Sequence, residues 1–421
     1  MEEIQKGLIR GEDGKLSKSI MNLVLCFDID ENLKDLFHYN EFSCSFEYAR
    51  NFTWPEHTRE IQKGKRIEDE DIIFLQYYFA HNKRFEMGID KIRNALLERA
   101  DRISFHPVKF YLSQLEWDGE ERLDQWLIKG CGVDDNIYTR EVGRKWITAA
   151  VSRIYHPGIK FDYVLVLEGK ENIGKSTVLR ILGDPWFTDS VSLLQKESDI
   201  VAKMVGNWII ELAEMNGIRK QESEFIKGFI SCQVDEQRLA FRRDPKKYYR
   251  QSVFAGTSNN MSYLLDADGN RRFWSVHCTK INMEWLRENK YQLFAEAKHI
   301  YETGIWTPHT RYGEKLFLEG KSLEMSRNQQ KMRLGTDEVM ENAIERYLIG
   351  KNETTMLEIL SECFKYDKKD LTNNRSQTIA IGRILKKLGF EKKERQASDG
   401  SIFKYIRETV VSQGQIIEEE E

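Results

Sequence analysis

The sequence of 421 residues has little of what marks secreted, zinc-binding or membrane proteins. Its six cysteines lie far apart, with no CxxC pair and no histidine at ligand spacing, so neither a disulfide framework nor a zinc site is expected. The N-terminus lacks the apolar core of a signal peptide, and no apolar run reaches the roughly 18 residues of a membrane helix. We therefore expect a soluble, cytoplasmic protein without a membrane partner.

An excess of positive charge is also missing. The formal net charge is −4, so any nucleic-acid surface must be local. Only six prolines occur, without a Gly/Ser linker or an internal repeat, so domain limits come from changes in hydrophobic pattern. Residues 1–135 indicate a mainly helical N-terminal domain, and residues 136–315 indicate strands that alternate with helices. A polar connector over 320–338 precedes a small C-terminal domain at 336–410.

One segment carries a specific chemical pattern, VLVLEGKENIGKSTVLRILG, from Val164 to Gly183. It contains GxxxxGK[ST] between a predicted buried strand and an amphipathic helix, which is the context of a phosphate-binding loop. Backbone N–H groups of such a loop surround a triphosphate, and the helix N-terminus adds positive potential. Lys175 would contact the β- and γ-phosphates, and the Ser176 hydroxyl would ligate Mg²⁺. The predicted ATP-binding residues are Gly169, Lys170, Glu171, Asn172, Ile173, Gly174, Lys175, Ser176 and Thr177.

Two further predicted strands of a parallel sheet end in polar residues that suit ATP hydrolysis. The strand in NWIIELAEMNG places Glu211 and Glu214 at or just beyond its end, where one carboxylate would hold Mg²⁺ and the other would polarise the attacking water. We favour Glu211 for the metal and Glu214 as the base, but their spacing leaves the division of roles open. The strand in VFAGTSNN ends near Asn259, whose amide can sense the γ-phosphate. Surface glutamates and a polar turn are the plain alternatives.

Two groups of cations follow these strands. Arg271 and Arg272 lie between a glycine turn and a new apolar run, where an arginine can reach a neighbouring subunit's γ-phosphate as an arginine finger. A solvated surface pair is the alternative. Residues 235–251 interleave cations with Phe241, Tyr248 and Tyr249, a pattern that suits phosphate neutralisation and base stacking. The predicted DNA-binding residues are Arg238, Arg242, Arg243, Lys246, Lys247 and Arg250.

These motifs, in this order, resemble the virulence-associated E family, P-loop proteins of prophages and mobile islands that are related to superfamily 3 and phage replication helicases. The matching segments are GKENIGKS, WIIELAE, FIKGFISCQVDEQRLAFRRD, VFAGTSNN and DADGNRRFWSV, with FHPVKFYLSQLEWDGEERLDQWL upstream and LFAEAKHIYETGIW downstream. They cover about residues 100–310.

The resemblance implies an α/β fold with a P-loop, AAA+-like ATPase core of the superfamily 3 type. It also implies a homo-oligomeric, hexameric ring that uses ATP to move along single-stranded or forked DNA during replication of the element. In that family the DNA-contacting loop lies between the second and third motif strands, which is where the cations of residues 235–251 occur. Lys227 and Arg238 match positions of that segment.

The C-terminal block predicts three helices and a hairpin with Asp399-Gly400 in its turn, which is typical of a winged helix. Its expected partner is origin duplex DNA, and a protein-contact module is the alternative. The candidate recognition helix carries Arg375, Gln377, Arg383, Lys386 and Lys387, and the candidate wing carries Lys392, Lys393 and Arg395.

One acidic pair has the spacing of primase-polymerase metal ligands, Asp28 and Asp30 in CFDIDEN. The flanking sequence predicts a helix and its end instead, so we expect no primase activity. The leading prediction is an ATPase that couples hydrolysis of ATP to ADP and phosphate to DNA unwinding. A DNA-binding initiator or regulator whose ATP site only switches assembly is one alternative, and a small-molecule phosphotransferase is another.

Overall fold

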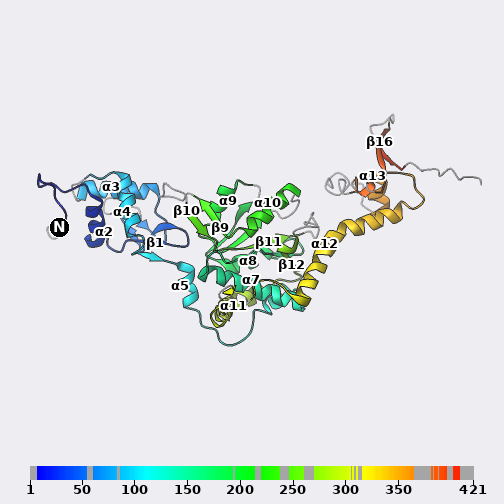
Figure 1. Ribbon diagram of the computed structural model, residues 1–421, viewed down its shortest axis with the longest axis horizontal. Helices are drawn as coiled ribbons and strands as arrows, with labels where there is room; N and C mark the ends of the chain where they lie inside the picture. Colours follow the sequence, from blue (N-terminus) through cyan, green and yellow to red (C-terminus); the bar gives the residue numbers. More distant parts are fainter. Residues whose placement is uncertain are drawn as a thin grey trace, which may run out of the picture. The chain divides into compact units, whose positions relative to one another are not determined.

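The computed structural model divides into two compact units (Figure 1). One consists of Met1–Tyr263 with Asp268–Arg327, and the other of Leu264–Ala267 with Asn328–Glu421. The residues that the structure describes are 7–54, 60–82, 86–192, 195–213, 220–237, 246–259, 270–304, 306–307, 310–311, 315–364, 381–382, 384–386, 388–395 and 402–407. Within them, no helix is long and apolar enough to cross a membrane.

The N-terminal residues form a core of their own from three helices and two small sheets. The helices are α2 (Ile20–Ile29), α3 (Asp69–Asn82) and α4 (Ile89–Arg99). The strands are β1 (Phe37–Asn40), β2 (Ser45–Tyr48) and β5 (Ser104–Phe105) in the order β2-β1-β5, and the pair β3 (Phe52–Thr53) with β4 (Glu60–Ile61). The helical prediction therefore missed strands of two to four residues, which are too short to show a period of two.

A five-stranded, all-parallel sheet forms the centre of the first unit, in the order β12-β6-β11-β8-β7 (Figure 1). Its strands are β6 (Val164–Glu168), β7 (Phe187–Ser192), β8 (Ile209–Ala213), β11 (Val253–Ser258) and β12 (Phe273–His277). All five residues of β6 are buried, as a strand covered on both faces requires. The three strands predicted from apolar runs are confirmed. The edge strand β7 was not predicted, because it is polar and Val191 is its one buried residue.

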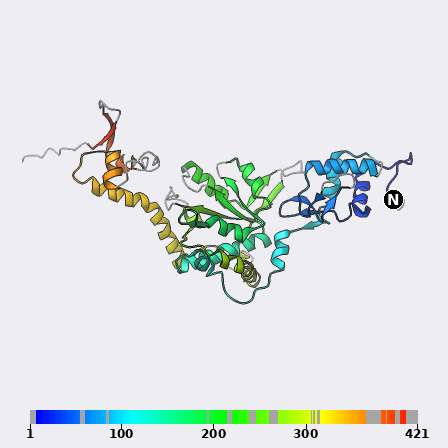
Figure 2. The ribbon, with the colours of Figure 1, turned by 180° about the vertical axis from the view of Figure 1, so that it is seen from behind.

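Helices α7 (Ile137–Tyr155) and α11 (Met283–Thr303) lie side by side against this sheet (Figure 2). Two short helices, α5 (Pro107–Ser113) and α6 (Trp126–Cys131), share the same core. Glu296 of α11 accepts the backbone N–H groups of Arg122 and Leu123 over 2.7 and 3.0 Å. The segments upstream and downstream of the P-loop that carry the resemblance are therefore joined directly to each other.

The predicted polar connector is instead part of a 28-residue helix, α12 (Gly320–Tyr347). Its first turns are anchored by small polar residues, since Ser322 is fully buried and donates to Glu141 Oε2 over 2.9 Å. Leu323 and Met325 pack against the core of the sheet. Buried serines lower the apolar content of a helix, which explains why the pattern looked like a linker.

The second unit contains a three-stranded antiparallel sheet in the order β15-β17-β16. Its strands are β15 (Glu353–Thr355), β16 (Glu391–Arg395) and β17 (Ile402–Ile406), so the predicted hairpin strands pair as expected. A short helix, α13 (Met356–Glu358), continues into a π-helical turn (Ile359–Cys363). Ile344, Leu348, Leu385 and Phe390 belong to its core. The turn at Asp399-Gly400 lies outside the described residues.

Candidate active site

The loop between β6 and α8 (Lys175–Gly183) has the backbone conformation that its glycines allow. Gly169 and Gly174 have φ of +147° and +101°, and Asn172 between them has φ of +61°. A Cβ at Gly169 would lie 2.5 Å from the carbonyl oxygen of Cys278, and one at Gly174 would overlap Met283 Cε. Both positions therefore require glycine for conformation and for space. Helix α8 begins at Lys175, as predicted.

Lys175 reaches back across this loop. Its buried ammonium donates to the carbonyl oxygens of Gly169 and Lys170 over 2.9 and 2.7 Å, and to Asn259 Oδ1 over 2.8 Å. Burial lowers the pKa of Lys175 from its ordinary value, while the negative charges of Glu171 and Glu211 act in the opposite direction. The predicted phosphate-binding cation at the start of α8 and the predicted sensor amide just after β11 are thus in direct contact.

Glu211 of β8 joins helix α8 and strand β11 through hydrogen bonds. Its Oε1 accepts hydrogen bonds from Ser176 Oγ and from Thr257 Oγ1, both over 2.7 Å. Glu211 is buried, and its Oε2 makes no hydrogen bond to any residue that the structure describes. A buried carboxylate oxygen without a partner is costly, and a carboxylate with a hydroxyl is a ligand set that Mg²⁺ accepts. The residues present therefore fit the predicted ion.

Thr257 is a part of this site that the sequence did not assign. The only signal was a hydroxyl near the end of an otherwise apolar strand. The predicted base Glu214 lies outside the described residues, just beyond the end of β8 at Ala213. The other predicted loop residues are exposed at Lys170, Glu171 and Asn172, and half-buried at Ile173 and Thr177.

The arginine pair lies at the amino-terminal ends of the strands, whereas its own P-loop lies at their carboxyl-terminal ends. In the β12–β6 pairing, Phe273 is opposite Val164 and His277 is opposite Glu168. Arg271 and Arg272 precede Phe273, whereas the P-loop follows Glu168. The separation is the length of a five-residue strand, or roughly 16 Å. These arginines are therefore too far along the sheet to contact a nucleotide in the P-loop of the same chain.

The two arginines also differ from each other. Arg272 is half-buried, and its Nε donates to Ser231 Oγ over 3.0 Å, at the last residue of α10 (Lys220–Ser231). Arg271 is exposed. Arg272 therefore makes a hydrogen bond within its own chain, whereas the Arg271 side chain is exposed to solvent.

The basic segment between β8 and β11 contains an antiparallel pair of strands, β9 (Val234–Gln237) and β10 (Lys246–Tyr249). Lys247 is exposed on β10. Arg238, Arg242 and Arg243 lie outside the described residues, and only the backbone of Lys246 is described.

Arg250 requires a correction. Its side chain is only 1% exposed and makes a bidentate pair with Asp235, with N···O distances of 2.6 and 2.7 Å. The guanidinium also lies 4.3 Å from the ring centroid of Phe229 and bonds the Phe229 carbonyl oxygen. Its charge and its donors are used within the chain, so Arg250 holds the base of the strand pair and is removed from the predicted DNA-binding set.

The remaining predicted sites fall into two groups. The acidic pair is engaged in the N-terminal core, where Asp28 pairs with Arg99 Nη2 over 2.7 Å and Asp30 accepts from the Tyr78 hydroxyl over 2.8 Å. The predicted helix is α2, and Asp30 is its C-cap. In the second unit, Lys386, Lys392 and Lys393 are exposed and Arg395 lies on β16. Arg375, Gln377, Arg383 and Lys387 lie outside the described residues.

Comparison with known proteins agrees with this arrangement. The sequence profile of the virulence-associated protein E-like domain matches residues 112–333, more than half of the 421 residues. The chain belongs to the virulence-associated protein E-like domain family. The VapE-like region includes the P-loop, all five strands of the parallel sheet and both arginines. The structure is thus an α/β fold with a central five-stranded parallel sheet, consistent with a P-loop ATPase in which the P-loop is the nucleotide-binding element.

A search of curated protein sequences finds no match. Among solved structures, the chain is similar to the A-form apo structure of the NrS-1 C-terminal region (305–718), with a TM-score of 0.41 and 12% identity. That alignment covers 93% of this chain and 100% of the other. A second apo structure of the same region gives a TM-score of 0.39 and 12% identity, covering 88% of this chain and 96% of the other.

Proposed function

We propose that this VapE-like protein is an ATP-dependent DNA helicase or translocase that acts in replication of a prophage or mobile genetic element. The observation that carries the proposal is the group formed by Lys175, Ser176 and Glu211 around the glycine loop, with one buried carboxylate oxygen that lacks a hydrogen bond among the described residues. A group of this kind suits a nucleoside triphosphate with its divalent cation.

Each residue of the site then has a chemical role. The Lys175 ammonium bonds to the carbonyl oxygens of Gly169 and Lys170 in the loop. Phosphate oxygens of ATP would replace these carbonyl oxygens as its partners. Ser176 and Glu211 would hold Mg²⁺, which neutralises charge on the phosphates. Thr257 orients the Glu211 carboxylate through its hydrogen bond. Asn259 would sense the γ-phosphate, and Glu214 remains the proposed base.

The order of strands in the sheet supports an AAA+-like ATPase core of the superfamily 3 type. Counted from the P-loop strand in chain order, the strands run 5-1-4-3-2 across the sheet. This order inserts β11, with Thr257 and Asn259 at its end, between the P-loop strand and the strand of Glu211. Strands β8 and β11 can therefore both direct polar groups to a nucleotide in the P-loop.

The place of the arginine pair supports a ring. A finger at the amino-terminal ends of the strands, away from its own P-loop, can serve only a nucleotide held by another copy. The active assembly is therefore a homo-oligomer, which we propose to be a hexamer. Arg271, the exposed member, is the proposed finger. Arg272 positions it through the bond to Ser231.

The proposed DNA contacts lie on the strand pair β9–β10 and its connection. Lys247 is exposed there, and the sequence adds Arg238, Arg242, Arg243 and Lys246. The arrangement of the second unit, with a helix, a strand and then a hairpin, agrees with a winged helix that binds origin duplex DNA.

The test is ATP hydrolysis with and without single-stranded DNA, together with unwinding of a forked duplex and a measurement of oligomer size. The wild type should hydrolyse ATP faster with DNA and should separate the fork, and Lys175→Ala should do neither while it keeps its fold. ATP-dependent assembly on DNA without unwinding would favour the initiator instead. Unchanged turnover in Lys175→Ala would remove the P-loop from the proposal.

A further inference from the structure

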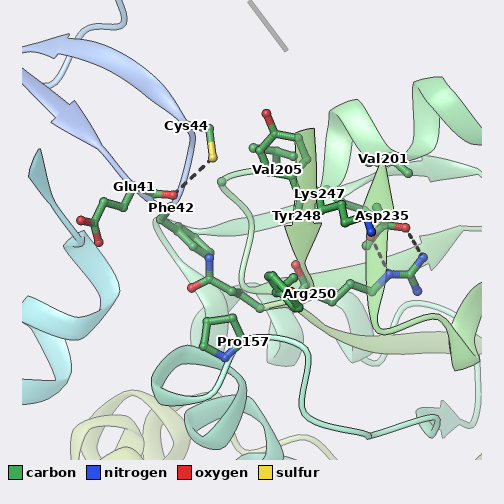
Figure 3. Close-up of a pocket in the computed structure, with 15 residues that line it drawn as sticks. Glu41, Phe42, Cys44, Pro157, Val201, Val205, Asp235, Lys247, Tyr248 and Arg250 are labelled. Carbon is green, nitrogen blue, oxygen red and sulfur yellow. Dashed lines mark hydrogen bonds and ion pairs between the residues drawn. The ribbon is translucent and has the colours of Figure 1, made fainter. Parts of the chain in front are cut away.

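A cavity of about 300 Å³ lies beside the β9–β10 strand pair, and no P-loop residue is among those that line it (Figure 3). Its walls come from distant parts of the first unit. One wall is β10 and the residues after it, and a second is the turn after β1, with Phe42. A third is the end of α9 (Glu197–Met204), with Val201 and Met204. A volume of this size suits one small planar ligand with a few polar groups.

Strand β10 contributes aromatic and cationic side chains to the cavity. Lys247 and Tyr249 lie on one face of the strand because side chains alternate, and both are exposed. The Tyr249 ring is 57% exposed, yet its position is set by close packing on Gly158. A Cβ at Gly158 would lie only 2.8 Å from Tyr249 Cδ1. An exposed ring that is held in place is a platform on which a nucleobase can stack.

Gln251 supplies a polar group of defined orientation. His106 Nδ1 accepts the backbone N–H of Lys109 over 3.2 Å, so a neutral His106 carries its proton on Nε2. Nε2 then donates to Gln251 Oε1 over 2.7 Å. Burial lowers the pKa of His106, which favours this neutral form. Gln251 is one of the residues that line the cavity, and its amide nitrogen is left as a donor for an acceptor atom of a ligand.

The charges around the cavity favour an anionic ligand at one side. Asp235 is neutralised by its bidentate pair with Arg250, and the two face each other in Figure 3. Lys247 remains as an exposed cation on the wall, and Glu41 lies at the rim as an exposed carboxylate. The chain next to Lys247 carries the further cations Arg242, Arg243 and Lys246 in sequence. A nucleic-acid backbone with a phosphate near Lys247 would pass the mouth of the cavity.

We propose that this cavity binds one nucleotide of single-stranded DNA, with its base stacked on Tyr249, an acceptor atom of the base bonded to the Gln251 amide, and its phosphate near Lys247. This inference rests on the proposed DNA-translocating function. The occupant is part of a DNA strand rather than a free nucleotide, because Tyr249 and Lys247 lie on β10, next in sequence to the other predicted DNA-binding residues. The site would hold one base out of the stack while neighbouring phosphates contact the cations.

The test uses anisotropy of a labelled single-stranded oligonucleotide with the full-length protein. Tyr249→Ala should weaken binding by between about 5-fold and 150-fold, the range for loss of one stacked base, with little change in salt dependence. Tyr249→Phe should bind like the wild type. Lys247→Ala should lower the salt slope by about one phosphate contact. Tyr291→Ala, a tyrosine of similar exposure at 53% on α11, is the matched control and should bind normally.

Oligonucleotides with a single abasic position identify the site directly. The wild type should lose affinity at a particular position, Tyr249→Ala should be insensitive to the same lesion, and Gln251→Ala should be less sensitive than the wild type. Equal abasic sensitivity in wild type and Tyr249→Ala would overturn the proposal, as would tight binding of free thymidine monophosphate that single-stranded DNA does not compete away. If wild-type protein binds no single-stranded DNA, the proposed function and this site both fail. If it binds DNA while Tyr249→Ala matches Tyr291→Ala, only this site fails.

Discussion

Ser176 Oγ and Glu211 Oε1 lie 2.7 Å apart, although a third strand, β11, separates β6 and β8 in the sheet. The contact is possible because all three strands are parallel, so their carboxyl-terminal ends lie on the same side of the sheet. Thr257 of β11 donates to the same carboxylate oxygen and holds it toward the P-loop. The geometry brings a hydroxyl and a carboxylate together where a triphosphate would lie.

Glu211→Gln should therefore impair hydrolysis more than nucleotide binding. The amide keeps an acceptor oxygen for Ser176 and Thr257 but removes the negative charge. We expect a fall in kcat of roughly 10²–10³-fold, the range for loss of one electrostatic stabiliser, and a higher Mg²⁺ requirement. Phosphate release across a Mg²⁺ titration measures both effects. Glu197→Gln, on the exposed start of α9, is the control, and normal turnover in Glu211→Gln would exclude Glu211 from the metal site.

The arginine pair predicts complementation between two inactive variants. Arg271→Ala should keep nucleotide binding but lose hydrolysis by about 10³-fold or more, since the finger acts on a neighbour. Lys175→Ala has the opposite defect, a damaged pocket with a sound finger. Mixed oligomers should regain part of the ATPase activity because some interfaces pair a good pocket with a good finger.

Arg272→Ala should lose less activity than Arg271→Ala, and Ser231→Ala should resemble it, because both remove the same hydrogen bond. No recovery in mixed oligomers that are shown to form would place the action of Arg271 within one subunit. A larger loss in Arg272→Ala than in Arg271→Ala would exchange the two proposed roles.

Arg250→Ala should act on stability rather than on the salt dependence of DNA binding. Removal of one partner leaves the Asp235 carboxylate buried and unpaired, which typically costs about 3–5 kcal/mol. Urea or thermal unfolding of the full chain measures this loss. The double variant Arg250→Met with Asp235→Leu should recover much of the stability. A stable Arg250→Ala protein with a reduced salt slope would return Arg250 to the DNA-binding set.

Removal of residues 336–421 should leave a folded ATPase. The start of α12 is held by Ser322, Leu323 and Met325 against the core of the sheet, while Ile344 and Leu348 belong to the core of the second unit. A cut before residue 336 separates these two sets of contacts. Binding to duplex DNA should fall more than binding to single strands. Complete loss of ATPase activity in a folded truncated protein would make the second unit part of the motor.

The sequence by itself determined the P-loop, its strand and helix, and the buried strands β8 and β11. These are local properties, because glycine spacing and runs of apolar residues report directly on backbone conformation and burial. The family resemblance also follows from the sequence, because it depends on the same local motifs. The boundary at residue 135 stays a prediction, and Leu123 and Trp126 before it pack in the core of the sheet rather than with the N-terminal core.

Only the tertiary structure decided which similar residues act differently. Arg250 and Lys247 look alike in sequence, but one is paired with Asp235 in the interior and the other is exposed. Arg271 and Arg272 are neighbours, yet only Arg272 bonds to Ser231 among the described residues. The Thr257–Glu211 contact and the cavity beside Tyr249 join segments far apart in the chain. Such pairings depend on strand order and side-chain packing, which local pattern does not encode.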